Sequence, residues 1–249
     1  MPLTAAQIVT IATQTARAPG YVAQAGQLLN SILSDLCQTY DIPAARKTFT
    51  SVFNPVGAPA NANYTNLQPG AGPYALPADF LRCIRDDQMW FLQGVPYPMI
   101  AVDLAEYDWY VQQAGNQSYP YVMATDLSAS PPLFVVWPAA SGAYPFQFRY
   151  QSQMPDIDTP ETSAVVPWFP NQRYLMKQLS GMLMELTDDD RSQTFLGDGD
   201  PDNPGSQAIL RKYLKEMNDP NTRAKRVTLD RRRFRNPTAN LKITKATGW

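Results

Sequence analysis

Aspartates provide the first pattern in this chain that suggests chemistry. Asp198, Asp200 and Asp202 alternate with other residues, as the first three ligands of a calcium-binding loop do. Such a loop also requires glycine at its sixth position and glutamate at its twelfth, where this chain has Asn203 and Ile209. We therefore interpret the segment as a turn and expect the protein to hold no metal and no cofactor.

The remaining carboxylate groups are adjacent in sequence, which favours solvated loops over catalysis. They are Asp86-Asp87 and the run 188–190. The chain contains no histidine, so it lacks the usual acid/base group at neutral pH and the commonest metal ligand. Nucleophile-elbow, phosphate-loop, dinucleotide-binding and zinc-protease motifs are also absent. Two distant carboxylates could still form a glycosidase pair, but we expect a protein that is not an enzyme.

Two cysteines, Cys37 and Cys83, are too few for a disulfide-stapled scaffold. Cys37 lies on the apolar face of a predicted helix, so we expect a buried, reduced thiol. No stretch approaches the ~20 apolar residues that cross a bilayer, and we expect no contact with membranes. Residues 1–10 have no charged segment followed by an apolar core, so we expect synthesis in the cytoplasm.

Positive charge is concentrated at the C-terminal end. Residues 211–249 hold 12 of the 21 Lys and Arg and 3 of the 22 Asp and Glu, a balance of +9, whereas the other residues hold 9 and 19, a balance of −10. A basic tail on an acidic body suggests an acidic partner, either nucleic acid or protein. The residues that we expect to bind it are Arg223, Lys225, Arg226, Arg231, Arg232, Arg233, Phe234, Arg235, Lys242, Lys245 and Trp249.

The last 29 residues have too few apolar side chains to form a core. Residues 241–244 alternate in the manner of a strand that adds to a sheet edge, and Arg and aromatic side chains are common interface anchors. Fully extended, this segment could reach ~95 Å. We interpret residues 221–249 as an extended arm that grips a neighbour; a solvated, disordered tail is the alternative.

Helices are predicted where helical periodicity falls between prolines. Thr4 and Gln7 have the spacing of a capping box, so the first helix starts there and runs to about Arg17. A second apolar stripe covers residues 22–40, and a third includes Leu175, Leu179, Met182, Leu183 and Leu186. We expect these two long helices to pack together. Two more helices are expected at 102–112, capped by Asp103, and at 206–217.

Strands are predicted between the two long helices. Phe146, Phe148 and Tyr150 alternate with polar residues, which indicates a half-buried strand. The apolar run 133–137 reads as its partner in a hairpin closed by the loop 138–145. Further strands are expected at 48–53 and 119–124, a second hairpin turns at Gly94, and residues 54–73 form a long loop.

The order of these parts resembles that of the head-to-tail adaptor proteins of tailed bacteriophages, especially short-tailed ones. Two helices precede a β-rich insertion that contains the segment LPADFLR, residues 76–82. A strand ending at Trp137-Pro138 and another ending near Tyr150 follow, and PWFPNQRYLMKQL then leads the long helix. The likeness covers roughly residues 20–190, and the order and spacing of short motifs carry it.

This resemblance implies a non-enzymatic component of the virion, located in the tail at the portal vertex. Such adaptors form a ring, expected to have 12 copies, between the portal protein and the tail tube or nozzle protein. Double-stranded DNA passes through the ring without specific binding. C-terminal arms in this family dock on the portal, which makes the eleven arm residues a portal-binding set.

The predicted fold class is α+β. We expect a helical bundle from residues 1–45 and 160–220, an inserted antiparallel β domain from 46–159, and the basic arm from 221–249. Two alternatives for function stay open. The first is a nucleic-acid-binding protein that uses the arm to hold phosphates, and the second is a different virion ring, either a head-completion or a tail nozzle protein.

Overall fold

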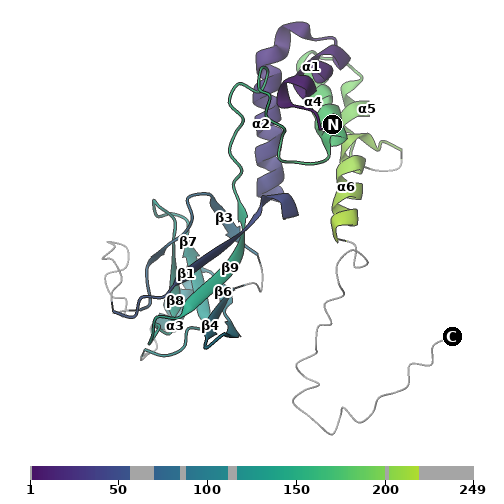
Figure 1. Cartoon of the computed structure of the whole chain (residues 1–249). Coiled ribbons are helices and arrows are strands. Elements are labelled where there is room, and N and C mark those ends of the chain that lie inside the picture. Colours follow the sequence, from purple (N-terminus) through teal and green to yellow (C-terminus); the bar gives the residue numbers. More distant parts are fainter. Residues whose placement is uncertain (1, 57–69, 85–87, 112–116, 200–201, 219–249) are drawn as a thin grey trace, which may run out of the picture.

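The structure of the protein, a computed structural model, describes residues 2–56, 70–84, 88–111, 117–199 and 202–218. The predicted arm, residues 221–249, lies outside these ranges, as do most of the predicted loop 54–73, Asp86-Asp87 and Asp200. The described part is elongated, with helices at one end and strands at the other (Figure 1). It is an α+β protein, as predicted.

Helices from both ends of the described chain lie together. They are α1 (Ala5–Thr15), α2 (Val22–Thr39), α4 (Gln172–Leu186), α5 (Ser192–Leu196) and α6 (Gly205–Asn218). The capping box is confirmed at α1, where the Gln7 N–H donates to Thr4 Oγ1 and the Thr4 N–H donates to Gln7 Oε1. Side-chain caps of this kind satisfy amides that have no partner within the helix, which explains why α1 begins there.

The two long helices pack together as predicted. Leu29, Ile32, Leu33 and Leu36 of α2 share one buried cluster with Leu175, Leu179 and Leu183 of α4. The predicted stripe is wrong at its end, because Leu186 is exposed and Met184 is buried instead. That the helices from the two ends of the chain together form a bundle stays a prediction.

One helix was missed by the sequence analysis. The segment between α4 and α6 contains α5, which packs so closely on α4 that a Cβ at Gly181 would lie 2.7 Å from Leu196 side-chain atoms. A glycine in the middle of a helix costs about 1 kcal/mol relative to alanine. A glycine at position 181, inside a predicted helix, could therefore have indicated that another segment packs closely on α4.

The strands form two sheets that pack face to face. Sheet A has the order β1 (Arg46–Val52), β9 (Pro145–Ser152), β4 (Met89–Leu92), β5 (Val95–Pro98), and β3 (Phe80–Cys83) also pairs with β9. Sheet B has the order β2 (Tyr74–Ala75), β8 (Leu133–Trp137), β7 (Val122–Asp126), β6 (Ile100–Val102). Rings from both sheets fill the space between them, and Phe134 meets Phe146 at a centroid distance of 5.2 Å.

The predicted hairpin between residues 133–137 and 146–150 is wrong. β8 pairs with β2 and β7 in sheet B, whereas β9 pairs with β1, β3 and β4 in sheet A. The connection between them crosses from one sheet to the other, so Phe134 and Phe148 face each other across the core. The alternation of apolar and polar residues showed which side chains share a buried face. It did not show whether the strand that covers this face is a neighbour in the same sheet or belongs to a second sheet packed against it.

The predicted all-antiparallel sheet also needs correction, because β6 runs parallel to β7. α3 (Leu104–Val111) joins these two strands and covers the outer face of sheet B, where Tyr107 is buried. Parallel neighbours require such a crossover, which a helix usually supplies. The predicted cap is confirmed by the Glu106 N–H, which donates to Asp103 Oδ1 at 2.7 Å. The strand expected at 119–124 is shifted to Val122–Asp126.

The chain passes between the two ends of the molecule twice. α2 leads down into β1, and residues 153–171 return beside α2 (Figure 1). The Asn30 amide fastens the return segment, because it donates to the Ile157 carbonyl at 3.0 Å and accepts from the Ile157 N–H at 3.1 Å. The domain boundaries at 45/46 and 159/160 stay predictions.

Candidate functional site

All eleven residues predicted to bind a partner lie outside the described residues. They are Arg223, Lys225, Arg226, Arg231, Arg232, Arg233, Phe234, Arg235, Lys242, Lys245 and Trp249. Their role stays a prediction. Three other sites stand out in the described part of the chain: a joint between the helices and the sheets, a groove among the helices, and the edges of the sheets.

Asp79 of the LPADFLR segment connects three strands at the joint. Its carboxylate accepts hydrogen bonds from the Tyr150 hydroxyl, at 2.9 Å, and from the Lys47 ammonium, while its carbonyl accepts from the Gln153 N–H at 2.7 Å. Partial burial raises the pKa of Asp79, but the hydrogen bonds from Lys47 and Tyr150 outweigh it, and the pKa lies below its ordinary value. The carboxylate thus stays ionised and holds β1 against β9.

Arg82 connects the same segment to the end of α2. Its guanidinium donates to the carbonyl oxygens of Cys37 and Gln38, at 3.1 and 2.8 Å, and to the Asp41 carboxylate at 2.8 and 3.0 Å. A cation at a helix C-terminus is stabilised by the free carbonyls and the helix dipole. The LPADFLR motif therefore fixes the orientation of the helices relative to the sandwich.

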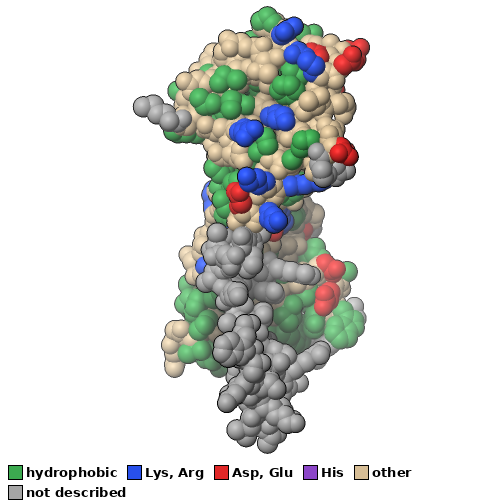
Figure 2. Space-filling view, turned by 90° about the vertical axis from the view of Figure 1, so that its right-hand side faces the viewer, with side chains coloured by type: hydrophobic (Ala, Val, Ile, Leu, Met, Phe, Trp, Pro, Cys, Tyr) green, Lys and Arg blue, Asp and Glu red, His purple; other side chains and the backbone are tan. Residues whose placement is uncertain are grey.

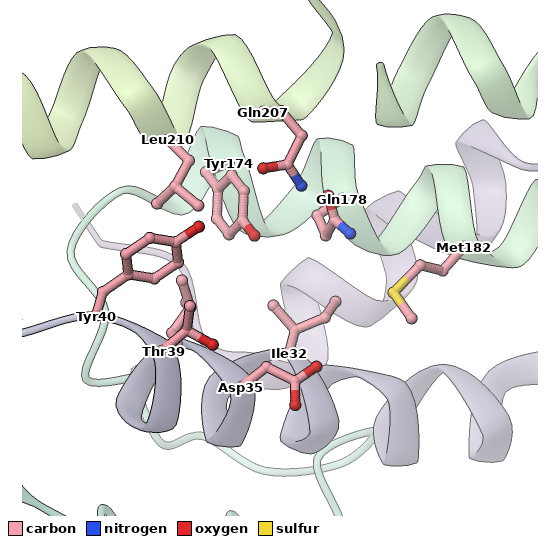
Figure 3. Close-up of a pocket in the computed structure, with 10 residues that line it drawn as sticks. Ile32, Asp35, Thr39, Tyr40, Tyr174, Gln178, Met182, Gln207 and Leu210 are labelled. Atoms are coloured by element: carbon pink, nitrogen blue, oxygen red, sulfur yellow. The ribbon is translucent and has the colours of Figure 1, made fainter. Parts of the chain in front are cut away.

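A groove of about 180 Å³ lies between α2, α4 and α6. Figure 3 shows Tyr40 and Tyr174 at one end and Asp35 on the α2 wall, facing Gln178 and Gln207 across the opening. Ile32, Leu36, Met182 and Leu210 supply apolar lining. The groove therefore combines aromatic, apolar, amide and carboxylate groups.

Several polar groups of the groove are already fixed. The Ser206 hydroxyl lies within hydrogen-bond distance of Gln178 Oε1 and of the Leu196 carbonyl, the latter at 2.9 Å, and these two acceptors share its single proton. Tyr174 is 4% exposed, and burial, together with the nearby Tyr40 and Asp35, raises its pKa to about 12. Its hydroxyl is consequently neutral and able both to donate and to accept.

The outer edges of sheet A differ in their capacity to accept another strand. The Phe53 N–H donates to the Tyr144 carbonyl at 2.9 Å, so hydrogen-bonded pairs recur at every second residue from there. The amides and carbonyls of Thr48, Thr50 and Val52 therefore point away from β9. No backbone group of another described residue bonds to them. Within the described part of the chain, β1 is thus an open edge.

The β5 edge is blocked by proline. Gln93 and Gly94 both have positive φ, which makes a two-residue type I′ turn whose closing pair, Leu92 and Val95, is hydrogen-bonded. Pro96 and Pro98 therefore face outward and offer no N–H.

The described residues show little that could perform catalysis. Burial raises the pKa of the Cys83 thiol to about 11 and also raises that of Cys37, so both thiols are protonated and poorly reactive at neutral pH. No group of three or more potential metal ligands occurs among the described residues. No described helix is long and apolar enough to cross a membrane.

Comparison with protein families gives a match over almost the whole chain. Residues 3–239 match the family described as SU10 adaptor protein. The chain belongs to the SU10 adaptor protein family. This membership confirms the resemblance to phage head-to-tail adaptors and makes the chain a structural adaptor. No curated protein gives a significant match.

Membership of the SU10 adaptor family extends the likeness beyond the segment from which it was inferred. The match begins near α1 and includes most of the basic arm. Sequence reasoning had singled out LPADFLR as part of the resemblance but assigned no role to Asp79 or Arg82. It also did not single out Asp35, because a charged residue on the solvent side of a helix is ordinary.

Proposed function

We propose that this chain is the subunit of a ring, expected to contain 12 copies, that joins the portal protein to the tail tube or nozzle of a short-tailed phage. The family match over residues 3–239 carries this proposal. In this proposal the ring continues the channel through which double-stranded DNA leaves the head, and the subunit catalyses no reaction.

The test of this proposal is stoichiometry. Purified particles should contain this chain and the portal protein in equal numbers, which quantitative mass spectrometry measures. If the chain instead forms a different virion ring, such as a head-completion or tail nozzle protein, its copy number should differ from that of the portal protein, or it should remain in particles that lack the adaptor ring.

We further propose that the arm binds the portal. Its cations suit an acidic surface, and residues 221–249 carry nine Lys and Arg against the single acid Asp230. Replacing Arg231, Arg232, Arg233 and Arg235 by serine should reduce portal binding strongly and make the remainder less dependent on salt, because fewer charge pairs are left to screen.

Co-sedimentation with purified portal over a series of salt concentrations measures this effect. A matched control removes four cations from the helices instead, at Arg173, Lys177, Lys212 and Lys215. Equal loss of binding in both variants would contradict a specific role for the arm and indicate a general effect of net charge.

Exposed apolar side chains on the sandwich support further protein contacts. Val95, Tyr97, Ile100, Trp109 and Tyr121 are all exposed, and groups of large apolar residues at the surface mark interaction sites. In the proposed ring they would contact a neighbouring subunit or the tail protein. Alanine at Trp109 should weaken assembly without unfolding the subunit, as gel filtration and circular dichroism would show.

The acidic balance of the body suits a channel through which DNA slides without adhering. One face is an exception, because Lys and Arg side chains outnumber acids over the helices in the view of Figure 2. We place the channel lining elsewhere. Reversing the charge of lumen-facing acids should slow DNA ejection, and an unchanged ejection rate would contradict this part of the proposal.

The concentration of cations in the arm also favours a second candidate, a nucleic-acid-binding module. It predicts DNA affinity that falls steeply with salt and disappears when the chain is truncated after residue 220. The adaptor proposal instead predicts that the truncated chain stays folded and loses portal attachment. Filter binding and portal co-sedimentation on the same truncated protein distinguish the two.

A further inference from the structure

The groove between α2, α4 and α6 contains polar groups whose hydrogen-bonding capacity is unused. The Tyr174 side chain is 4% exposed and lines the groove, yet its hydroxyl makes no hydrogen bond to any described residue. Asp35 has no ion-pair partner within the described chain either. Two polar groups that line one groove and have no partner among the described residues indicate a site that another group can complete.

The lining defines the chemistry of that group. Asp35 is the one charged side chain among the lining residues, so a cation is favoured. The rings of Tyr40 and Tyr174 favour a flat cation that can lie against aromatic faces. Ile32, Leu36 and Met182 suit an aliphatic stem. Arginine combines these three properties, since its planar guanidinium is carried on three methylene groups.

The volume of the groove fits one such side chain. A protein cavity of ~150 Å³ accommodates benzene, which has six heavy atoms. An arginine side chain has seven heavy atoms beyond Cα, and the groove measures about 180 Å³. One arginine therefore fits, whereas a helix or a nucleotide would not.

The chain itself carries a suitable source of arginine close to the groove. Leu210 of α6 lines the groove, and α6 ends eight residues later at Asn218, which is ~12 Å further along the helix. Arg231 follows Asn218 by 13 residues, a span that can extend ~45 Å. The run Arg231, Arg232, Arg233 and Arg235 can therefore turn back and reach the groove.

We propose that the groove between α2, α4 and α6 binds one arginine of residues 231–235 of the same chain. The contact holds the arm against the subunit before assembly. Its release on the portal rests on the proposed function, whereas the contact itself does not.

The contact is weak enough to be released. A partly exposed ion pair and a cation–π contact are each worth little in water, so a free arginine should bind only at millimolar concentrations. The covalent link supplies an effective concentration of the same order, which gives substantial but incomplete occupancy. A portal surface that engages several arginines at once would therefore displace the arm.

The test uses the full-length, unassembled chain and limited digestion with trypsin. Trypsin cleaves after Arg231, Arg232, Arg233 and Arg235, and an arginine held in the groove is protected. Asp35→Asn should raise the initial rate of cleavage at these sites severalfold, and high salt should do the same to the wild-type chain. Mass spectrometry of the early fragments measures the rates.

The matched control is Asp188→Asn, which removes the same charge from an exposed site at the end of α4, outside the groove. Its cleavage rates should equal those of the wild type. Equal rates for Asp35→Asn and the wild type would overturn the proposal. Circular dichroism and thermal unfolding of both variants show whether the fold is unchanged.

A second measurement identifies the chain that supplies the arginine. A photoreactive amino acid in place of Gln207, at the rim of the groove, should cross-link to residues 231–235. In a mixture of light and isotopically heavy chains, the products should be light–light and heavy–heavy. Mixed products would overturn the assignment to the same chain, and cross-links elsewhere would overturn the site.

The two proposals can fail independently. Protection that depends on Asp35 without any portal binding by the arm would contradict the proposed function alone. Portal binding by an arm whose cleavage is the same with and without Asp35 would contradict the groove contact alone.

Discussion

At the scale of single residues, three tyrosines that pack in the apolar clusters of the helices and of the two sheets remain protonated far into the alkaline range. Burial raises the pKa of Tyr74, Tyr150 and Tyr174 to about 12 in each case, with the hydrogen bond to Asp79 adding to the effect at Tyr150. An unfolded tyrosine has a pKa of about 10. Their contribution to stability is therefore fully present below pH ~10 and is lost as the pH rises through about 12. Between these two pH values the unfolded chain releases its tyrosine protons while the folded chain keeps them, and this release stabilises the unfolded state.

Tyr174→Phe should make the free energy of unfolding fall less steeply with pH in the alkaline range. The slope should decrease by the contribution of about one proton, because one titrating hydroxyl is removed. The hydroxyl has no hydrogen-bond partner among described residues, so the substitution should change stability at pH 7 by less than about 1 kcal/mol. Urea unfolding at a series of pH values from neutral to alkaline measures both effects. Tyr97→Phe, on the exposed β5 edge, is the control; an equal change in that variant would contradict burial as the cause.

At the scale of elements, the two outer strands of sheet A present different edges. β1 offers outward amides at Thr48, Thr50 and Val52, whereas β5 places prolines at the corresponding outward positions. An open, proline-free edge is a site where another chain can add a strand. The register of β1 on β9 therefore decides which residues of β1 are available to a partner.

Proline scanning of β1 tests that register. Thr50→Pro removes an outward amide and should cost little stability, on the order of 1 kcal/mol or less, because edge strands tolerate proline there. Ser51→Pro removes the amide that bonds to the Phe146 carbonyl and should cost about 1 to 3 kcal/mol. Thermal or urea unfolding measures the difference. The reverse order would show that the register is shifted by one residue.

At the scale of the whole molecule, two clusters of side chains depend on one joint for their relative orientation. Arg82 reaches from β3 to the last carbonyls of α2, and Asn30 of α2 holds the returning segment at Ile157. In the proposed ring each subunit would meet a different partner at each end, so it would have to present two surfaces at a constant spacing. A joint made of oriented hydrogen bonds provides that constancy.

Arg82→Ala should therefore allow the helices and the sheets a wider range of relative orientations. It should also lower the free energy of unfolding by about 1 to 3 kcal/mol. Arg82→Lys should be nearly as disruptive, since an ammonium cannot bond the Cys37 and Gln38 carbonyls and the Asp41 carboxylate in one fixed geometry. Small-angle X-ray scattering would detect the change in shape. Arg191→Ala, which removes an ion pair with Asp189 within the helices, is the control and should leave the scattering curve unchanged.

The sequence by itself determined the helices other than α5, the buried faces of the strands and the family. Capping residues such as Thr4 and Gln7 act within one turn, and proline limits a helix wherever it stands, so local chemistry was sufficient for α1, α2, α4 and α6. The order of short motifs around LPADFLR was sufficient for the resemblance to adaptors, and the family match over residues 3–239 confirms it.

Only the tertiary structure decided which strands are neighbours and where a site forms. The alternation at Phe146 and Phe148 shows that one face of β9 is buried, but it carries no information on whether Phe134 reaches that face from the next strand or from the opposite sheet. The groove follows the same logic, because Asp35, Tyr174 and Gln207 come from three helices and meet only after those helices pack. Periodicity is a property of one element, whereas pairing and convergence depend on the contacts among all of them.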